Sequence, residues 1–318
     1  MHSPVAIALK SIDIAPAVSF ENLLLFPLVL SDDVQPGVAG YHTLDDGLNR
    51  REVEITEISE QGSVPELRVV NRGSSPVLVV DGEELVGAKQ NRVVNLTILV
   101  APQSELTIPV SCVEAGRWRA RSRTFTSAPR AQYSSGRAKR KSQVTRSLAN
   151  DGMASSDQAQ VWSDIADKFV QLRTSSPTGA MEALFTHHGP FIDACVERCQ
   201  PIRRQVGALF AIKDTIVGFD LFDSPDTLRV LLPKLVRSVA LDALDRGGGR
   251  VSPPTANADE GTTTFAAALF LGTVGTARSH VSPGVGLGRN LRLTGQGLTG
   301  AALVNEKRVV HLSAFTLT

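Results

Sequence analysis

Short stretches of alternating apolar and polar residues predict β-strands in the first third of the chain. Arg51–Ile58 shows the pattern most clearly, because Val53 and Ile55 fall on one face and Glu52 and Glu54 on the other. The other strand-like runs are Phe20–Leu30, Glu66–Asn71, Pro76–Val80, Val93–Val100 and Leu106–Cys112. Short strands that are separated by Gly, Ser, Asp and Pro turn signals are typical of an antiparallel sandwich or roll.

A helical spacing of apolar residues replaces this alternation later in the chain. Val161, Ile165 and Phe169 share one face of a helix that Ser156 or Asp157 would cap. Other segments with helical character are Tyr41–Leu48, which Thr43 would cap, a helix near Arg137–Leu148, Pro190–Cys199 and Leu228–Leu244. Strand-like runs return at Gln205–Phe210, Val217–Phe222, Leu291–Thr294, Leu298–Asn305 and Arg308–Phe315.

These elements predict an α+β fold. The first half would form an antiparallel β-sandwich or roll, and the second half would mix helices and strands. The last strands are apolar, like the first, so we expect them to return to the first sheet. We divide the chain into a β-rich region at 1–118, a basic mobile loop and helix at 119–150, and an α+β region at 151–318, with the first and last packed as one compact unit.

The composition is that of a folded, soluble protein without a dominant charge. The chain has 318 residues, of which 42% are hydrophobic and 20% charged, and its net charge is +1. No overall field would therefore steer it toward nucleic acid or a membrane. No apolar run reaches the ~18 residues of a transmembrane helix, the N-terminus lacks the charged region of a signal peptide, and three cysteines do not make a disulfide framework. We expect a cytoplasmic protein.

One segment departs from this neutral balance. Residues 115–150 contain ten basic residues and no acidic one. A mobile basic segment of this kind suits a lid that closes over an anionic ligand. Phe125 and Tyr133 lie among the basic residues, so nucleic-acid binding through residues 117–146 is the alternative. The neutral charge of the whole chain argues against the alternative.

Polar side chains crowd one short connection between two apolar runs. After Pro76–Val80 and Asp81-Gly82 come Glu83, Glu84, Lys89, Gln90, Asn91 and Arg92. A carboxylate shielded from water has a raised pKa, which makes Glu83 and Glu84 candidates for a general base. Lys89 and Arg92 would bind a phosphate or carboxylate. The amide side chains of Gln90 and Asn91 would orient a ribose or an amide. The alternative is a buried ion-pair network in which Glu84 and Arg92 fix a hairpin.

A second polar group follows the strand Leu106–Cys112. A Cys112 nucleophile would need a base or a positive field, and Arg117 could supply only the field. The alternative is a packed thiol at a strand end. Glu114, Arg117 and Trp118 would form a wall for a ligand, since an indole ring stacks on a base. The alternative for Trp118 is a residue that covers the core at its rim.

Three further features give weaker predictions. His187-His188 with Cys195 and Cys199 does not match a usual zinc spacing, so core thiols are the simpler interpretation and we assign no metal ligand. Gly284–Gly288 lacks the context of a dinucleotide-binding loop, although Arg289 and Arg292 beside it could contact an anion. His311 on a closing strand is a candidate site residue or a satisfied core histidine.

Several motifs resemble one known family. They are Gly40–Asp46, Ile55–Val69, Asp81–Arg92, Ile108–Trp118, Asp157–Trp162 and Val285–Arg289. The chain is similar to the ARG and rhodanese-phosphatase-superfamily-associated protein domain family, where ARG stands for ADP-ribosylglycohydrolase. The resemblance covers most of residues 18–315. It implies partners of the ADP-ribosylglycohydrolase or rhodanese-phosphatase type and favours a ligand related to ADP-ribose or NAD, without supplying a catalytic set.

We therefore predict a protein that binds an ADP-ribose- or NAD-like anionic nucleotide and possesses, in Glu83 or Glu84, a base with which to hydrolyse it. The expected ligand-binding residues are Lys89, Gln90, Asn91, Arg92, Glu114, Arg117 and Trp118, with Cys112, Arg289 and His311 as weaker candidates. A non-enzymatic scaffold for ADP-ribose-processing enzymes is the first alternative. The residues identify no cofactor, and they are compatible with a homo-oligomer.

Overall fold

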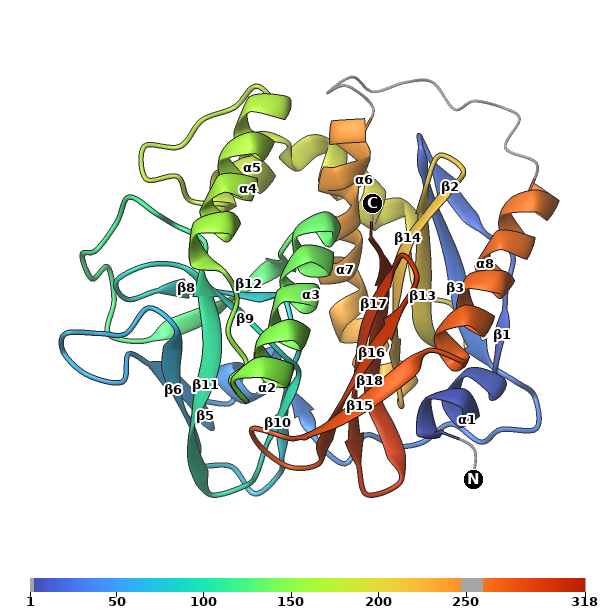
Figure 1. The fold of residues 1–318 in the computed structure, drawn as a ribbon, viewed down its shortest axis with the longest axis horizontal. Helices are drawn as coiled ribbons and strands as arrows, with labels where there is room; N and C mark the ends of the chain where they lie inside the picture. The colour runs from blue at the N-terminus through green and yellow to red at the C-terminus, as the bar shows by residue number, and fades with distance from the viewer. Residues whose placement is uncertain (1–2, 247–259, 318) are drawn as a thin grey trace.

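Three β-sheets organise the computed structural model, which describes residues 3–246 and 260–317. The largest sheet has nine strands in the order β1-β3-β13-β14-β18-β17-β16-β15, with β2 paired to β3 (Figure 1). All its pairs are antiparallel. The strands are β1 (Ile12–Ile14), β2 (Val18–Phe20), β3 (Leu23–Leu30), β13 (Gln205–Ile212), β14 (Thr215–Phe222), β15 (Arg278–Pro283), β16 (Arg289–Gly295), β17 (Leu298–Asn305) and β18 (Arg308–Thr316). The closing strands thus return to the sheet that the first strands begin, as predicted.

Two smaller sheets carry the remaining strands. A six-stranded sheet has the order β12-β8-β9-β11-β6-β5, and a three-stranded sheet has the order β10-β7-β4. Their inward side chains share one core, to which Ile55, Val79 and Val110 belong. The strands are β4 (His42–Thr43), β5 (Val53–Thr56), β6 (Glu66–Asn71), β7 (Val77–Val79), β8 (Glu83–Gly87), β9 (Arg92–Val94), β10 (Ile98–Val100), β11 (Ser104–Cys112) and β12 (Phe125–Ala131). The predicted α+β class with antiparallel sheets is confirmed, although β4 and β7 pair in parallel.

Two of these strands lie where the sequence predicts other structure. β8 forms within the connection that was expected to join two strands, and β12 forms within the segment that was expected to be a loop. Both carry charged residues that are buried, Glu83 and Glu84 in β8 and Arg130 in β12. A strand is recognised in a sequence from polar residues that face the solvent and alternate with apolar ones. Charged residues that point inward and pair with distant residues disturb this alternation, so it does not reveal β8 and β12.

Helices fill the space between the sheets and cover the far face of the largest one. They are α1 (Pro4–Lys10), α2 (Leu44–Asn49), α3 (Ser134–Asn150), α4 (Gln158–Gln171), α5 (Glu182–His187), α6 (Gly189–Arg198), α7 (Pro225–Arg246) and α8 (Glu260–Gly275). α7 contacts both β12 and β13, and α3 contacts β14, β17 and β18 (Figure 1). α1 and α8 cover the opposite face of the large sheet. The predicted caps are present, Thr43 on α2 and Asp157 on α4. No helix among the described residues has the length and apolar character needed to cross a membrane.

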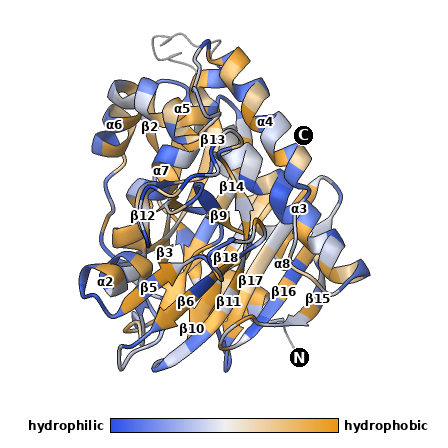
Figure 2. Ribbon diagram, turned by 90° about the vertical axis from the view of Figure 1, so that its left-hand side faces the viewer, coloured by the Kyte–Doolittle hydropathy of each residue, from blue (hydrophilic) through white to orange (hydrophobic). Residues whose placement is uncertain are grey.

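The two faces of the large sheet differ in chemistry. On β13, Leu209 and Ala211 join the core beneath α1 and α8, whereas Ala208 and Phe210 join the core beneath α7. The side that faces α3 is polar: Asp220 of β14 pairs with Ser313 of β18 in the sheet register. Figure 2 shows hydrophilic residues along α3, although this helix packs on the sheet. A charged interior is therefore expected between α3 and the sheet.

Candidate functional site

The two adjacent carboxylates of β8 serve opposite faces of the strand, since successive strand residues point to opposite sides. Glu83 accepts a hydrogen bond from Nζ of Lys234 on α7 at 2.6 Å. The same Nζ lies 2.9 Å from Oδ1 of Asp45 on α2 and 2.7 Å from Oγ of Ser127 on β12. Glu83 thus joins α7, α2 and β12 in one buried network.

Glu84 belongs to a different network on the other face. Its Oε2 accepts from Nε of Arg130 at 2.6 Å, and its Oε1 accepts from Nδ2 of Asn91 at 3.4 Å. Arg130 also lies 3.4 Å from Glu182 at the start of α5. Burial raises the pKa of Glu84, although Arg130 acts in the opposite direction. The alternative interpretation, a buried ion pair at Glu84, is correct in kind but wrong in its partner, because Arg130 of β12 and not Arg92 pairs with Glu84.

Glu114 connects the two polar groups that the sequence singles out. Its Oε2 accepts from the backbone N of Asn91 at 3.1 Å and from Nη2 of Arg117 at 2.6 Å. Nε2 of Gln90 donates to the Glu114 backbone O at 2.9 Å, and Oγ1 of Thr178 donates to Oε1 at 2.9 Å. Burial acts to raise the pKa of Glu114, but the hydrogen bonds from Arg117 and Thr178 lower it. The segment 89–92 and the end of β11 are therefore in direct contact.

Arg92 is fully buried and incompletely paired. Its Nη1 donates to Oε1 of Gln90 at 3.1 Å, whereas Nε and Nη2 have no hydrogen-bond partner among the described residues. The ring of Trp118, which is 49% exposed, has its centroid 5.8 Å from Cζ of Arg92 and 5.3 Å from Nζ of Lys89. Burial raises the pKa of the nearby Cys112 thiol, although Arg92 acts to lower it. A neutral thiol is a poor nucleophile, so this environment favours a packed Cys112.

A cavity of about 440 Å³ opens beside this cluster. Glu182 lies in its wall and lies within 3.5 Å of Asn91 and of Arg130. Thr178 also lies in the wall and holds Glu114. The polar lining consists of Arg121, Thr174, Ser175, Ser176, Thr178, Glu182, Thr186 and His187. Pockets of this size accommodate small-molecule ligands.

The distant members of these networks have no local signal in the sequence. Lys234 is 151 residues from Glu83, Glu182 is 91 residues from Asn91, and Arg130 is 46 residues from Glu84. No local pattern marks a partner at that separation. The excess of basic residues in 115–150 is the only hint of these partners in the sequence. If any of those basic residues are buried, they need acidic partners elsewhere in the chain.

The basic segment divides between the interior and the surface. Arg117, Arg130, Arg137, Arg140 and Lys141 are buried. Arg119, Arg121 and Arg123 are exposed on the loop that precedes β12. A nucleic-acid surface needs its cations at the surface to neutralise phosphates. The burial of these five cations therefore weakens the case for binding through residues 117–146.

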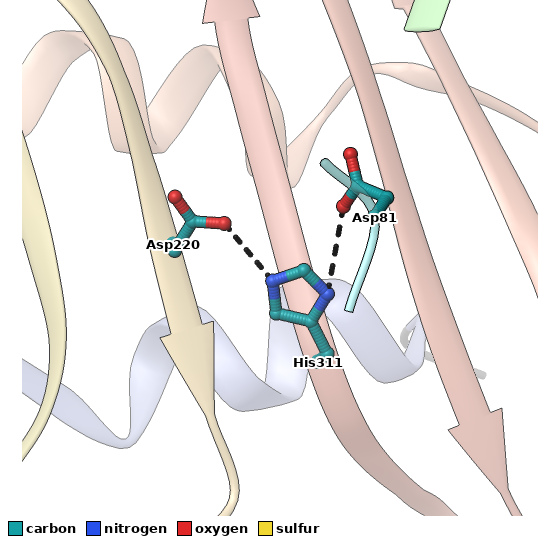
Figure 3. A group of neighbouring side chains, drawn as sticks. All are labelled: Asp81, Asp220 and His311. Atoms are coloured by element: carbon teal, nitrogen blue, oxygen red, sulfur yellow. Dashed lines mark hydrogen bonds and ion pairs between the residues drawn. The ribbon is translucent and has the colours of Figure 1, made fainter. Parts of the chain in front are cut away.

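His311 belongs to a second polar cluster, between α3 and the large sheet. Its Nε2 lies 3.0 Å from Asp220 and its Nδ1 lies 3.9 Å from Asp81 (Figure 3). Nδ1 also lies 2.8 Å from Oγ1 of Thr97. Lys141 of α3 pairs with Asp81 at 2.7 Å. Burial acts to raise the pKa of Asp81, but Lys141 and its neighbouring cations hold it well below its usual range. His311 is thus a buried residue with hydrogen-bond partners on both ring nitrogens.

Asp81, Asp220 and His311 are the residues of the described chain whose ligand atoms converge as a metal site requires, within 4.8 Å of one another. Their carboxylates already accept hydrogen bonds from Lys141 and Arg137. A divalent cation would add charge to an interior that is already rich in cations, so the donor set does not suit a metal. The His187, His188, Cys195 and Cys199 side chains do not converge in this way in the described residues.

The glycine-rich segment before β16 has a packing role. A Cβ on Gly286 would lie 2.2 Å from the backbone O of Leu99 on β10, and Leu287 N donates to that same oxygen at 2.8 Å. Only glycine allows this close approach. Arg289 next to it is exposed, whereas Arg292 is buried. The segment therefore attaches the large sheet to the three-stranded sheet.

Comparison with known proteins gives one result. The family model for the ARG and Rhodanese-Phosphatase-superfamily-associated Protein domain matches residues 11–315. No curated protein and no solved structure gives a match.

Proposed function

Because the chain belongs to the ARG and Rhodanese-Phosphatase-superfamily-associated Protein domain family, we propose that it binds an anionic nucleotide of the ADP-ribose or NAD type in the cavity beside Glu182. The family name associates its members with ADP-ribosylglycohydrolases and with the rhodanese-phosphatase superfamily. An ADP-ribosylglycohydrolase acts on ADP-ribosyl groups, so a protein that works beside one would encounter ADP-ribose. This is an argument from association, and the chemistry of the site has to support it independently.

The observation that carries the proposal is the lining of the cavity. It combines five hydroxyl side chains with one exposed arginine, Arg121, and one carboxylate, Glu182. Hydroxyl groups and a guanidinium are donors for a pyrophosphate, and a carboxylate accepts from ribose hydroxyls. Thr178 and Glu182 link this lining to Glu114, Asn91 and Arg130. Glu114, Asn91 and Arg130 would then hold the wall of the cavity in place.

The loop that carries Arg121 also provides a surface for a base. Trp118 is three residues earlier on the same loop and half of its ring is exposed. An adenine stacked on this ring would have phosphates within reach of a basic rim formed by Lys89 and Arg121. Movement of Trp118 would also uncover Arg92, whose Nε and Nη2 have no partner in the described residues.

Hydrolysis would need a base that reaches the ligand. Glu83 and Glu84 are 2% and 0% exposed and each forms an ion pair, so in this arrangement they position Lys234 and Arg130. Glu182 is the carboxylate that borders the cavity, with its side chain 38% exposed. We therefore propose nucleotide binding as the function. Glu182 is the first residue to test for a role in hydrolysis, and Glu84 is the second, because burial raises its pKa.

Calorimetric titration and thermal shift with ADP-ribose, NAD, AMP and ribose 5-phosphate test the proposal. We expect ADP-ribose or NAD to bind, and Arg121→Met to weaken binding about 10-fold through loss of a charge-assisted hydrogen bond. Arg123→Met removes an exposed arginine that is not part of the lining and serves as the matched control. Absence of binding by all four compounds at millimolar concentration would contradict the proposal. Product analysis by chromatography, with Glu182→Gln as the variant, separates binding from hydrolysis.

The first alternative is a non-enzymatic scaffold for a partner enzyme. The burial of Glu83 with Lys234 and of Glu84 with Arg130 favours it, because these residues then serve only to hold the structure together. On this alternative Glu84→Gln lowers stability and no nucleotide binds. The titration above distinguishes the two cases.

A further inference from the structure

The inward face of α3 presents three cations to the large sheet. Arg137, Arg140 and Lys141 lie on this face, and each is between 1% and 2% exposed. Arg292 of β16 faces them from the sheet and is 1% exposed. It donates from Nη2 to the backbone O of Lys141 at 2.9 Å, which places it against α3. Four cations are therefore buried between one helix and one sheet.

Two of these cations have a counter-charge. Arg137 donates to both carboxylate oxygens of Asp220, at 2.9 and 2.7 Å. Lys141 donates to Asp81 at 2.7 Å. Asp220 and Asp81 are thus paired with Arg137 and Lys141, and His311 lies between the two carboxylates.

The other two cations form no ion pair in the described residues, although both lie within the field of Asp81. Arg292 donates only to neutral oxygens, those of Thr145 and of the Lys141 backbone. The Nε, Nη1 and Nη2 atoms of Arg140 are all buried and have no hydrogen-bond partner among residues 3–246 and 260–317. Burial lowers the pKa of both guanidinium groups to about 10, although the charge of Asp81 acts to raise both. The charges of Arg137 and Arg292 also lower the pKa of Arg140. Both groups remain charged at neutral pH, and an unpaired buried charge is strongly destabilising.

We infer that a small tetrahedral oxyanion of the phosphate class is held between α3 and the large sheet by Arg140 and Arg292. A dianion matches the surplus of two positive charges, and a guanidinium binds such an oxyanion through two parallel hydrogen bonds. The nitrogens of Arg140 have no contact with solvent, so the ion enters when α3 closes on the sheet during folding, and the flexible Arg140 side chain moves to make room for it. This site lies on the large sheet and is independent of the nucleotide cavity beside α5.

Anion content of the purified protein is the direct test. The whole chain is purified without phosphate or sulfate, denatured in acid, and the released anions are measured by ion chromatography. We expect phosphate or sulfate at about one ion per chain, as for a ligand that binds only the folded state. We expect Arg140→Met to release none, and Arg146→Met, which removes an exposed arginine from the same helix, to release as much as the wild type. A wild-type protein without either anion overturns the inference, as does an Arg140→Met variant that retains it.

Thermal stability gives a second readout, which works even if the bound ion is lost during purification. If an anion is present, inorganic phosphate raises the Tm of the wild type and of Arg146→Met, but not that of Arg140→Met. If no anion is present, Arg140→Met removes an unpaired buried charge and is more stable than the wild type at every phosphate concentration. That second result would overturn the inference. Nucleotide binding in the cavity is followed separately by the absorbance of adenine and by Arg121→Met, so either proposal can fail alone.

Discussion

At the scale of single residues, environment decides what each polar side chain can do. Glu83 and Glu84 are neighbours in sequence, yet one binds Lys234 and the other Arg130. Their chemistry follows from the side of β8 on which each lies. The segment Glu83–Arg92, which was predicted to carry catalytic residues, mainly forms buried hydrogen bonds. Within it, Arg92 has donors without a partner in the described residues.

Lys141 should make stability depend on pH in the alkaline range. Burial lowers its pKa to about 8, against the opposing effect of Asp81, while Arg137 and Arg292 also act to lower it. Between about pH 8 and its ordinary value of 10.5, the unfolded chain holds a proton that the folded chain does not, so this residue's contribution to stability rises with pH.

Urea unfolding at several pH values checks this expectation. The free energy of unfolding of the wild type, relative to Lys141→Met, should increase as the pH rises from 8 to 10, by at most about 1.4 kcal/mol per pH unit. Lys139→Met, on the exposed face of the same helix, is the matched control variant. Parallel profiles for wild type and Lys141→Met would show that Lys141 does not titrate in this range.

At the scale of elements, the short helix α2 depends on its cap and in turn positions a residue of the site. Thr43 and Asp46 form a capping box, and Asp45 of the same helix holds Lys234 beside Glu83. Thr43→Ala should lower the free energy of unfolding by about 1 kcal/mol, because it removes the acceptor for the Asp46 amide. Thr43→Ser keeps the hydroxyl and is the control. Equal urea midpoints for the Ala and Ser variants would rule out this role of the cap.

The elements also show how far the sequence alone can lead. Apolar periodicity predicts α4 and β5, because Val161 and Ile165 or Val53 and Ile55 repeat at the spacing of their element. It fails for β8 and β12, whose buried charges resemble a surface loop. For the candidate site, contacts between 89–92 and 112–118 could be anticipated, since both follow strand-like runs of the β-rich region 1–118. Lys234 and Glu182 could not, because ion pairs between distant segments leave no local pattern.

At the scale of the whole molecule, buried ion pairs join the sheets into one unit. Arg137 on α3 lies between Asp220 of the large sheet and Asp81 after β7. Lys234 on α7 reaches Glu83 of β8 and Asp45 of α2. These links predict that the halves of the molecule unfold together.

A single unfolding transition is therefore expected. Trp118 lies on the loop after β11 and Trp162 lies in α4, so their fluorescence reports on this part of the chain. Far-UV circular dichroism reports on all elements. The two urea curves should coincide. Lys234→Met should shift both equally, by about 3–5 kcal/mol, because it leaves Glu83 buried without a partner. Arg229→Met, exposed on the same helix, is the control. A fluorescence change that precedes the circular dichroism change would indicate separate units.

The order of strands in the large sheet has a consequence for how the protein is made. β18 is the last strand among the described residues, yet it lies in the middle of the sheet, between β14 and β17. During synthesis on the ribosome, β1, β2, β3, β13 and β14 emerge as one incomplete sheet and β15, β16 and β17 as another. Neither has its neighbour until residues 308–316 leave the exit tunnel. Until then both sheets have an unpaired edge, which is the period when the nascent chain has most need of a chaperone.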